Sequence, residues 1–285
     1  MEKKKLTQHM ILALALSMSV GCSGSSSKSV KSSSDSDMVE GGGGASATAI
    51  EKVVADTGDT GEGVATTVRT LGATVSQVDL LGTGEVTSGT GEIITNVGDG
   101  VGSLATGLKD GLGALSENDN AIGTTLAGVT GTVFETGEAV SAAGNTIGSL
   151  NTLPVFSQID EATGLLTELD GTVSSLGATV TEIGGVLSVS FEEGALSGTT
   201  TDLTAVVRPL VTNVGGITQS LGDALVVGPV GGKLLSELGT AVVVLGNHIS
   251  DDENAVLAGV GGTVVGAGQL VIDAGGVISV AEPGQ

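Results

Sequence analysis

Side chains that could do chemistry are scarce in this sequence of 285 residues. After residue 21 the only histidine is His248, which lies beside Asn247 and just before the polar residues that start at Ser250. No G-x-S-x-G pattern marks a nucleophilic serine. We therefore expect His248 at an exposed helix end, and we predict that the protein is not an enzyme.

Two acidic clusters carry the oxygen ligands that calcium prefers. They are Glu117-Asn118-Asp119-Asn120 and Asp251-Asp252-Glu253-Asn254. Neither has the spacing of an EF-hand loop. Both precede an apolar periodic segment, and acidic residues are favourable where a helix begins. Helix capping is the leading interpretation, and an acidic calcium- or ligand-binding module is the alternative.

The segment Gly98-Asp99-Gly100-Val101-Gly102 has glycines spaced as in some phosphate-binding loops. It follows no predicted strand, and it lacks the Gly-Lys-Ser/Thr ending that such loops need. We expect a helix break or a packing site there. No cofactor and no metal are predicted.

The lone cysteine, Cys22, follows a basic start and an apolar run from Met10 to Val20, which is the pattern of a bacterial secretory signal. Ser19-Val20-Gly21-Cys22 resembles a lipobox, although most lipoboxes have Leu where Ser19 stands. The resemblance implies a signal peptide over 1–21 and a lipid on Cys22, which would anchor the chain to a membrane. Ser23 favours the outer membrane, as in Gram-negative lipoproteins. The alternative is an ordinary signal peptide with a chance cysteine.

Charge and composition limit the partners and the core. Without residues 1–21, seven basic and 31 acidic residues remain, a net charge of −24. Such a charge repels nucleic acid, so no nucleic-acid partner is expected. There is no Trp or Tyr, there are only three Phe, and there are 49 Gly. Any core must therefore consist of Leu, Val, Ile and Ala.

The spacing of apolar residues predicts helices. From Ser116 to Leu150, apolar residues recur three, four or seven apart, and no alternating pattern favours a strand. The same spacing appears in other segments, which gives an all-α bundle of Gly-rich amphipathic helices. Breaks or caps are expected at 82–91, Ser157–Asp160, 188–200, Pro209, Gly228–Pro229 and Ser250–Glu253.

Short identities indicate an internal duplication. Leu71-Gly-Ala-Thr-Val75 recurs at 176–180, Thr95-Asn-Val-Gly98 at 212–215, and Leu126-Ala-Gly-Val129 at 257–260. The expected organisation is a signal peptide (1–21), a Ser/Gly-rich tether (22–50), and two helical repeat halves. The halves are assigned to residues 51–155 and 156–282. Coincidence in a chain of few residue types is the alternative.

Several segments carry a family resemblance. Gly111–Leu115, Asn120–Val129 and the recurring Leu-Gly-x-x-Val units make the chain similar to the middle domain of bacterial collagen-like proteins. The chain lacks Gly-X-Y tracts and has four Pro, so it forms no collagen triple helix. The resemblance supplies no catalytic residues. We expect a structural, adhesive or self-associating envelope lipoprotein, with the membrane, a homo-oligomer or another envelope protein as partner.

Overall fold

The computed structural model describes residues 44–79, 82–224, 227–250 and 255–278. The chain divides into two units, 1–39 and 40–285, and all described residues lie in the second. Every regular element in these ranges is helical, which confirms the all-α prediction. The elements are α2 (Gly44–Ser76), α3 (Gly84–Asp110), η1 (Leu112–Ala114), α4 (Ala121–Ser149), η2 (Leu150–Thr152), α5 (Pro154–Thr163), α6 (Leu165–Glu192), α7 (Ser197–Ala224), α8 (Val227–Ser250) and α9 (Ala255–Ile278).

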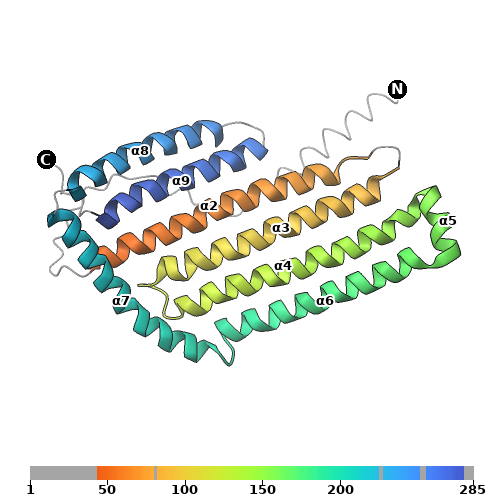
Figure 1. Ribbon diagram of the computed structural model, residues 1–285, viewed down its shortest axis with the longest axis horizontal. Helices are drawn as coiled ribbons and strands as arrows, with labels where there is room; N and C mark the ends of the chain where they lie inside the picture. Colours follow the sequence, from red (N-terminus) through yellow and green to blue (C-terminus); the bar gives the residue numbers. More distant parts are fainter. Residues whose placement is uncertain (1–43, 80–81, 225–226, 251–254, 279–285) are drawn as a thin grey trace, which may run out of the picture. The chain divides into compact units, whose positions relative to one another are not determined.

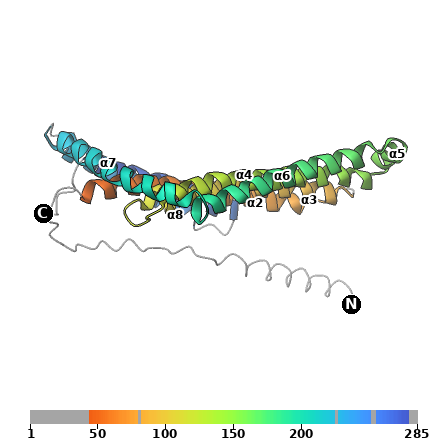
Figure 2. The same cartoon turned by 90° about the horizontal axis from the view of Figure 1, so that it is seen from below.

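Six of these helices lie side by side in the order α8, α9, α2, α3, α4, α6 (Figure 1). The extensive contacts are those between neighbours in this order. The view turned by 90° shows the same helices in a layer one helix thick (Figure 2). Along the chain, α2, α3, α4 and α6 come first and α8 and α9 come last, so α9 packs back on α2. The bundle is therefore a single layer of antiparallel helices, which we call the helical layer.

Small residues fill the contacts between neighbouring helices. A Cβ built on Gly107 of α3 would lie 2.6 Å from the Cα of Gly128 in α4. One built on Gly72 of α2 would lie 2.6 Å from the carbonyl oxygen of Gly91 in α3. Glycine costs about 1 kcal/mol in a helix, and close backbone approach offsets that cost through dispersion contacts.

Of the predicted core of Leu, Val, Ile and Ala, the described chain buries mainly the alanines, and most of the Leu, Val and Ile stay partly exposed. The buried hydrophobic residues are seven alanines and Leu115. Val97 is 53% exposed and Leu176 is 59% exposed, although both lie in the predicted apolar stripes. The reason is the layer itself, because neighbours cover only two opposite sides of each inner helix. Those sides carry mainly Gly, Ala, Ser and Thr, with Val265 and Ile272 also present where α9 meets α8, and the Leu and Val stripes lie between them.

Several predicted breaks lie elsewhere. The segment Ser157–Asp160 does not start a helix, because α5 already begins at Pro154, where proline suits the first turn. Pro209 lies inside α7, which continues through it. The break at 82–91 is shorter than predicted, since α3 begins at Gly84. Gly228 and Pro229 lie within the first turn of α8. The turn between α6 and α7 falls within 188–200, as expected.

The duplication stays a prediction. Its first half corresponds to α2, α3 and α4, which pack consecutively. Elements of its second half are separated, because α6 packs on α4 and α9 packs on α2. Helix α2 begins at Gly44, inside the segment predicted as tether.

Candidate functional site

The helical layer has two different faces. On α3, Gly98 and Gly102 approach Arg69 of α2, whereas Gly100 and Gly107 approach α4 on the opposite side. Residues between these sides point out of the layer, by the periodicity of 3.6 residues per turn. On one side of the layer they include Asp99, which pairs with Arg69. On the other side they are the apolar residues of the predicted stripe.

The apolar residues of all six helices lie on the same side. Neighbouring helices run antiparallel, and the glycine contacts fix which side of each helix meets which neighbour. The apolar residues of each helix lie between these two sides and form one stripe. The stripes of all six helices fall on a common surface, which we call the apolar face. It comprises Val64, Val68, Leu71 and Val75 (α2), Val97, Val101, Leu104 and Leu108 (α3), Val129, Val133, Val140 and Ile147 (α4), Leu169, Val173, Leu176, Val180 and Ile183 (α6), Leu234, Leu238, Val242 and Leu245 (α8), and Leu257, Val260, Val264 and Val271 (α9).

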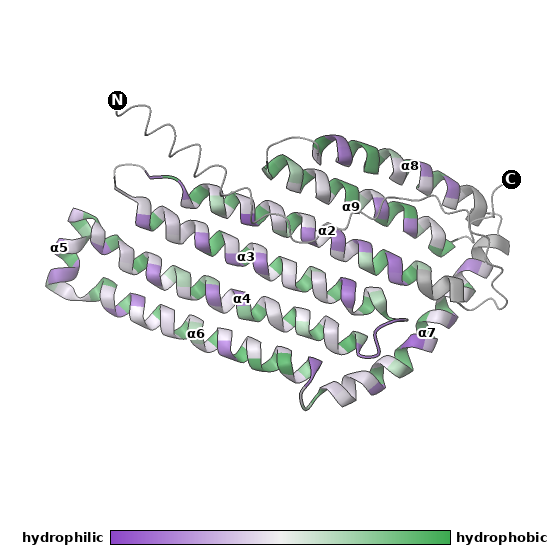
Figure 3. Cartoon of the chain, turned by 180° about the vertical axis from the view of Figure 1, so that it is seen from behind, coloured by the Kyte–Doolittle hydropathy of each residue, from purple (hydrophilic) through white to green (hydrophobic). Residues whose placement is uncertain are grey.

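Hydropathy along the ribbons agrees with this pattern. Figure 3 shows hydrophobic and hydrophilic residues alternating within each helix of the layer, so that no helix is apolar all round. Helix α9 comes closest, because an 18-residue window in it has a mean hydropathy of 1.8. By length and composition alone, α9 is able to cross a membrane. It packs instead between α2 and α8, through Gly266 on one side and Gly268 on the other.

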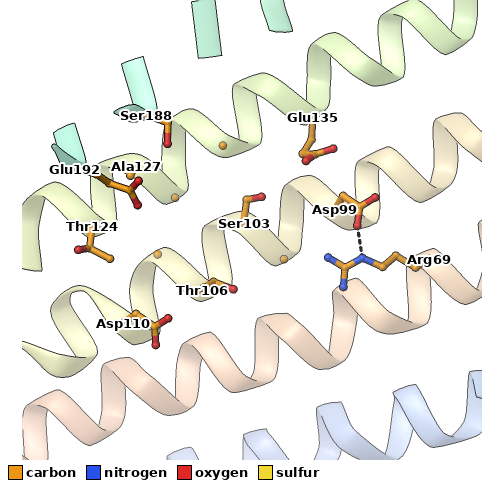
Figure 4. A pocket seen from close by; sticks show the side chains of 14 residues that line it. Arg69, Asp99, Ser103, Thr106, Asp110, Thr124, Ala127, Glu135, Ser188 and Glu192 are labelled. Carbon is orange, nitrogen blue, oxygen red and sulfur yellow. Dashed lines mark hydrogen bonds and ion pairs between the residues drawn. The ribbon is translucent and has the colours of Figure 1, made fainter. Parts of the chain in front are cut away.

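The opposite surface of the layer, which carries Asp99 and which we call the polar face, holds a groove of about 510 Å³. Figure 4 shows it between α2, α3 and α4, with α6 at one end. The Arg69 Nε donates to Asp99 Oδ1 at 2.5 Å. Burial raises the pKa of the half-buried Glu135 carboxyl, and the neighbouring charges of Asp99 and Glu138 raise it further. Further acidic and hydroxyl side chains line the groove: Ser103, Thr106, Asp110, Thr124, Ser188 and Glu192.

Other charged contacts cross between α2 and α3 on this face. The Lys109 Nζ lies 2.7 Å from Asp59 Oδ1 and 3.7 Å from Glu62 Oε2. The Thr106 hydroxyl donates to Glu62 at 3.4 Å. The hydrogen bond to Asp59 raises the pKa of Lys109. These contacts fix the rotation of α2 relative to α3. They do not bring several charged groups together around one point, as a binding site would.

A carboxyl pair, with Asp56 buried and Asp273 half-buried, lies between α2 and α9. Asp56, which is 7% exposed, lies within hydrogen-bonding reach of the Asp273 carboxyl. Burial raises the pKa of Asp56 to about 8, and the hydrogen bond and negative charge of Asp273 contribute to the rise. The raised pKa favours the neutral form of the Asp56 carboxyl at neutral pH.

The acidic cluster Glu117–Asn120 serves the fold. The Asn118 amide donates to the Asp110 carbonyl at 2.8 Å, and Asn118 Oδ1 accepts from the Asn120 backbone at 2.9 Å. The Asn120 amide donates to the Phe191 carbonyl at 2.9 Å. The N-cap residue Asn120 makes no side-chain cap hydrogen bond to α4, whose Ile122 backbone N–H instead donates to the Thr204 hydroxyl of α7 at 3.1 Å. The cluster holds a turn and ties it to α6, which differs from the predicted cap.

The remaining predicted site residues do not form a site. Gly98, Gly100 and Gly102 lie in α3 as packing positions, as expected. His248 is exposed in the last turn of α8. In the part of the chain that the structure describes, no three His, Cys, Asp or Glu residues are placed to hold a metal ion. Cys22 and the cluster Asp251–Asn254 lie outside the described residues.

The apolar face is the feature that sequence reasoning missed. The stripes are plain in the sequence, but their periodicity is the same for a helix in a core and for a helix in an open layer. The signal lay in the residues between the stripes. Gly, Ala, Ser and Thr predominate on two opposite sides of α2, α3 and α4, which is the mark of neighbours on both sides.

The comparisons with known proteins give a family for this chain. Residues 78–280 match the protein family described as bacterial collagen, middle region. No curated protein and no solved structure matches the chain. The matched segment runs from the residues before α3 through the end of α9, and so takes in most of the helical layer. The protein therefore belongs to the bacterial collagen middle-region family, and this membership points to a structural rather than a catalytic role.

Proposed function

We propose that this protein is a non-enzymatic lipoprotein, anchored to the bacterial outer membrane through Cys22, that performs a structural or self-associating role at the cell envelope. The observation that carries the structural part is the apolar face of the helical layer. The chain exposes Leu and Val over six helices, far more apolar surface than a monomer usually leaves in water. An exposed surface of this kind is typical of proteins that assemble.

The anchor is supported by the sequence. A basic start, an apolar run and a lone cysteine after Gly21 are the features of a lipoprotein signal. Residues 22–43 then join the anchor to the start of α2. The Ser- and Gly-rich composition of that stretch suits a tether, which would let the helical layer stand off the membrane.

Labelling of cells with radioactive palmitate tests the anchor. We expect the wild-type protein to carry label and to sediment with outer membranes. The Cys22→Ala variant should carry none and should appear in the soluble fraction. A Ser29→Ala variant, which changes a neighbouring residue of the tether, is the control and should behave as wild type. Equal labelling of the Cys22→Ala variant would disprove lipidation at this residue.

The polar groove favours a second candidate, an acidic ligand-binding module. Asp99, Asp110, Glu135 and Glu192 all line it, so a cation is the ligand that it would attract. Thermal melts with and without millimolar calcium test this function. A rise of several degrees that is lost in Glu135→Gln would support it, and an unchanged melting temperature would reject it.

A further inference from the structure

We propose that the apolar face binds a second copy of this chain, so that two helical layers stack face to face as a dimer. The proposal deepens the structural role proposed above and does not depend on the lipid anchor. Helical domains normally consist of two packed layers, because each helix must bury its apolar stripe against another element. Within the described residues the helical layer covers the sides of its helices and leaves the stripes uncovered.

The exposed area is large enough for a stable dimer. Leu71 of α2, Val97 of α3 and Val129 of α4 are 45%, 53% and 44% exposed, and similar values recur on α6, α8 and α9. Together these side chains expose on the order of 1,000 Å² of apolar surface, whereas a standard interface takes about 800 Å² from each partner. The largest apolar patch on a typical monomer is roughly 300–600 Å². This surface therefore exceeds what a monomer leaves in water.

The distribution of charge favours a second copy. Helical periodicity places every charged residue of the six layered helices off the apolar face. Charged residues such as Asp99 and Glu62 lie on the opposite face, where their ion pairs are found. Stacking through the apolar face would keep the two acidic faces apart by about two helix layers, roughly 20 Å. This spacing exceeds the Debye length of about 8 Å at physiological salt, so the repulsion between copies is screened.

The shape of the stripes also suits a second copy. Within α2, Val64, Val68, Leu71 and Val75 step by four, three and four residues, as in a coiled-coil seam. Ridges with this spacing fit the grooves of another helix that carries the same pattern. An isologous contact would bring identical stripes together around a twofold axis.

A lipid surface is a poorer occupant. Helices that lie on a membrane carry Lys and Arg on the polar face and use Trp or Tyr at the interface. This chain has no Trp or Tyr, and its net charge of −22 opposes approach to anionic headgroups. A second copy of the chain therefore fits the apolar face better than a membrane does, and binding to vesicles is measured separately below.

The test measures the mass of the mature Cys22→Ala chain by sedimentation equilibrium. We expect a dimer in the micromolar range or below. Leu71→Glu and Val97→Glu should each weaken association at least about tenfold, because each would bury an unpaired charge at the interface. Both residues are already exposed in the single chain, so circular dichroism should show unchanged helicity. Ala73→Glu, two residues from Leu71 and exposed on the polar side of α2, is the matched control and should dimerise normally.

Two results would overturn the proposal. One is a monomeric Cys22→Ala chain at about 100 μM, because a well-packed interface of standard size binds more tightly than that. The other is equal weakening by Leu71→Glu and Ala73→Glu. Co-sedimentation with phosphatidylcholine vesicles provides a separate arm. A monomer that binds these vesicles through Leu71 would assign the apolar face to lipid instead, and palmitate labelling would still decide the anchor independently.

Discussion

Gly107 of α3 and Gly128 of α4 lie back to back, so that a Cβ built on either one would lie 2.6 Å from the Cα of the other. Real side chains cannot approach the backbone this closely, and only glycine on both helices permits the contact. Similar pairs recur between other neighbours, as at Gly137 against Gly177 and at Gly239 against Gly268. The glycine content of this chain therefore holds helices together along their sides.

Alanine at Gly107 should destabilise the protein by about 1–3 kcal/mol, because the cost of overpacking exceeds the gain in helix propensity. Alanine at Gly171 of α6 is the control. Its Cβ would meet nothing within 4 Å, so this variant should gain up to about 1 kcal/mol. The free energy of unfolding from urea titration measures both. A Gly107→Ala variant as stable as Gly171→Ala would contradict the packing described here.

Stability should fall as pH rises from about 4 to 8, because of Asp56. The folded state raises the pKa of its carboxyl from 3.8 to about 8, so folding takes up a proton between these values. The stabilising contribution of the neutral acid is complete below pH 4 and is lost as pH rises through 8. Melting temperatures over this range measure the slope, in parallel with an Asp56→Asn variant.

Asp56→Asn keeps the shape and a hydrogen-bond donor but cannot ionise. Its pH profile should be flatter, and above pH 8 it should be more stable than wild type, because the charged pair with Asp273 is gone. Glu92→Gln, which changes an exposed carboxyl of α3 beside the opposite end of α2, is the control and should keep the wild-type slope. Identical profiles for wild type and Asp56→Asn would rule out the protonated pair.

Removal of Asp160 should loosen the start of α6. Its carboxylate accepts hydrogen bonds from the Leu166 backbone at 2.6 Å, from the Thr167 hydroxyl at 2.7 Å and from the Asn151 amide at 2.7 Å. The side-chain hydrogen bonds from Thr167 and Asn151 are the main cause that lowers the pKa of Asp160 to about 2.

Asp160→Ala should therefore lower the melting temperature at pH 7. Since the folded-state pKa is depressed, the contribution is present above pH 3.8 and is lost as pH falls toward 2. The difference between wild type and variant should shrink over this acid range. Glu161→Ala, the exposed neighbour in α5, serves as the comparison and should change little.

The Arg208 side chain should stabilise the packing of α7 on the layer through its hydrogen bond to a backbone carbonyl. Its ion pair with Asp119 should contribute little to stability. The Arg208 Nε donates to the Leu115 carbonyl at 2.8 Å, and its Nη2 lies 3.3 Å from Asp119, whose side chain is 90% exposed. Arg208→Ala should cost about 1–2 kcal/mol and speed amide exchange in the turn at 115–120. Asp119→Asn should stay within about 0.5 kcal/mol of wild type, because exposed ion pairs contribute little. An equal loss in both variants would assign the effect to the ion pair.

The helices of this fold are predictable from sequence, and their arrangement is not. Leu126, Val129 and Val133 mark α4 by spacing alone. The same spacing predicted that they would be buried, yet Val129 is 44% exposed. Periodicity reports which residues share a side of a helix, but not whether another element covers that side. The pairing of α2 with α9 joins residues about 200 positions apart, and no local pattern encodes it.

Several predictions of local features were wrong for a related reason. Asp160 was expected to cap its own helix, but it caps the next one across the turn at Gly164, whose φ of 65° suits glycine. Pro209 was expected to break α7, which continues through it. The buried carboxyl of Asp56 was not anticipated, because its partner Asp273 comes from the last helix. These features depend on contacts between distant segments.

A distance between spin labels on the two outermost helices tests the single layer most directly. Labels at Glu182→Cys in α6 and Asn247→Cys in α8, in the Cys22→Ala chain diluted with unlabelled protein, report the separation within one copy. The two helices are five interhelical steps apart in the layer, which places them roughly 40–50 Å apart at about 8–10 Å per step. A distance below about 20 Å would show that the helices close into a compact bundle, and would contradict the open layer and its apolar face.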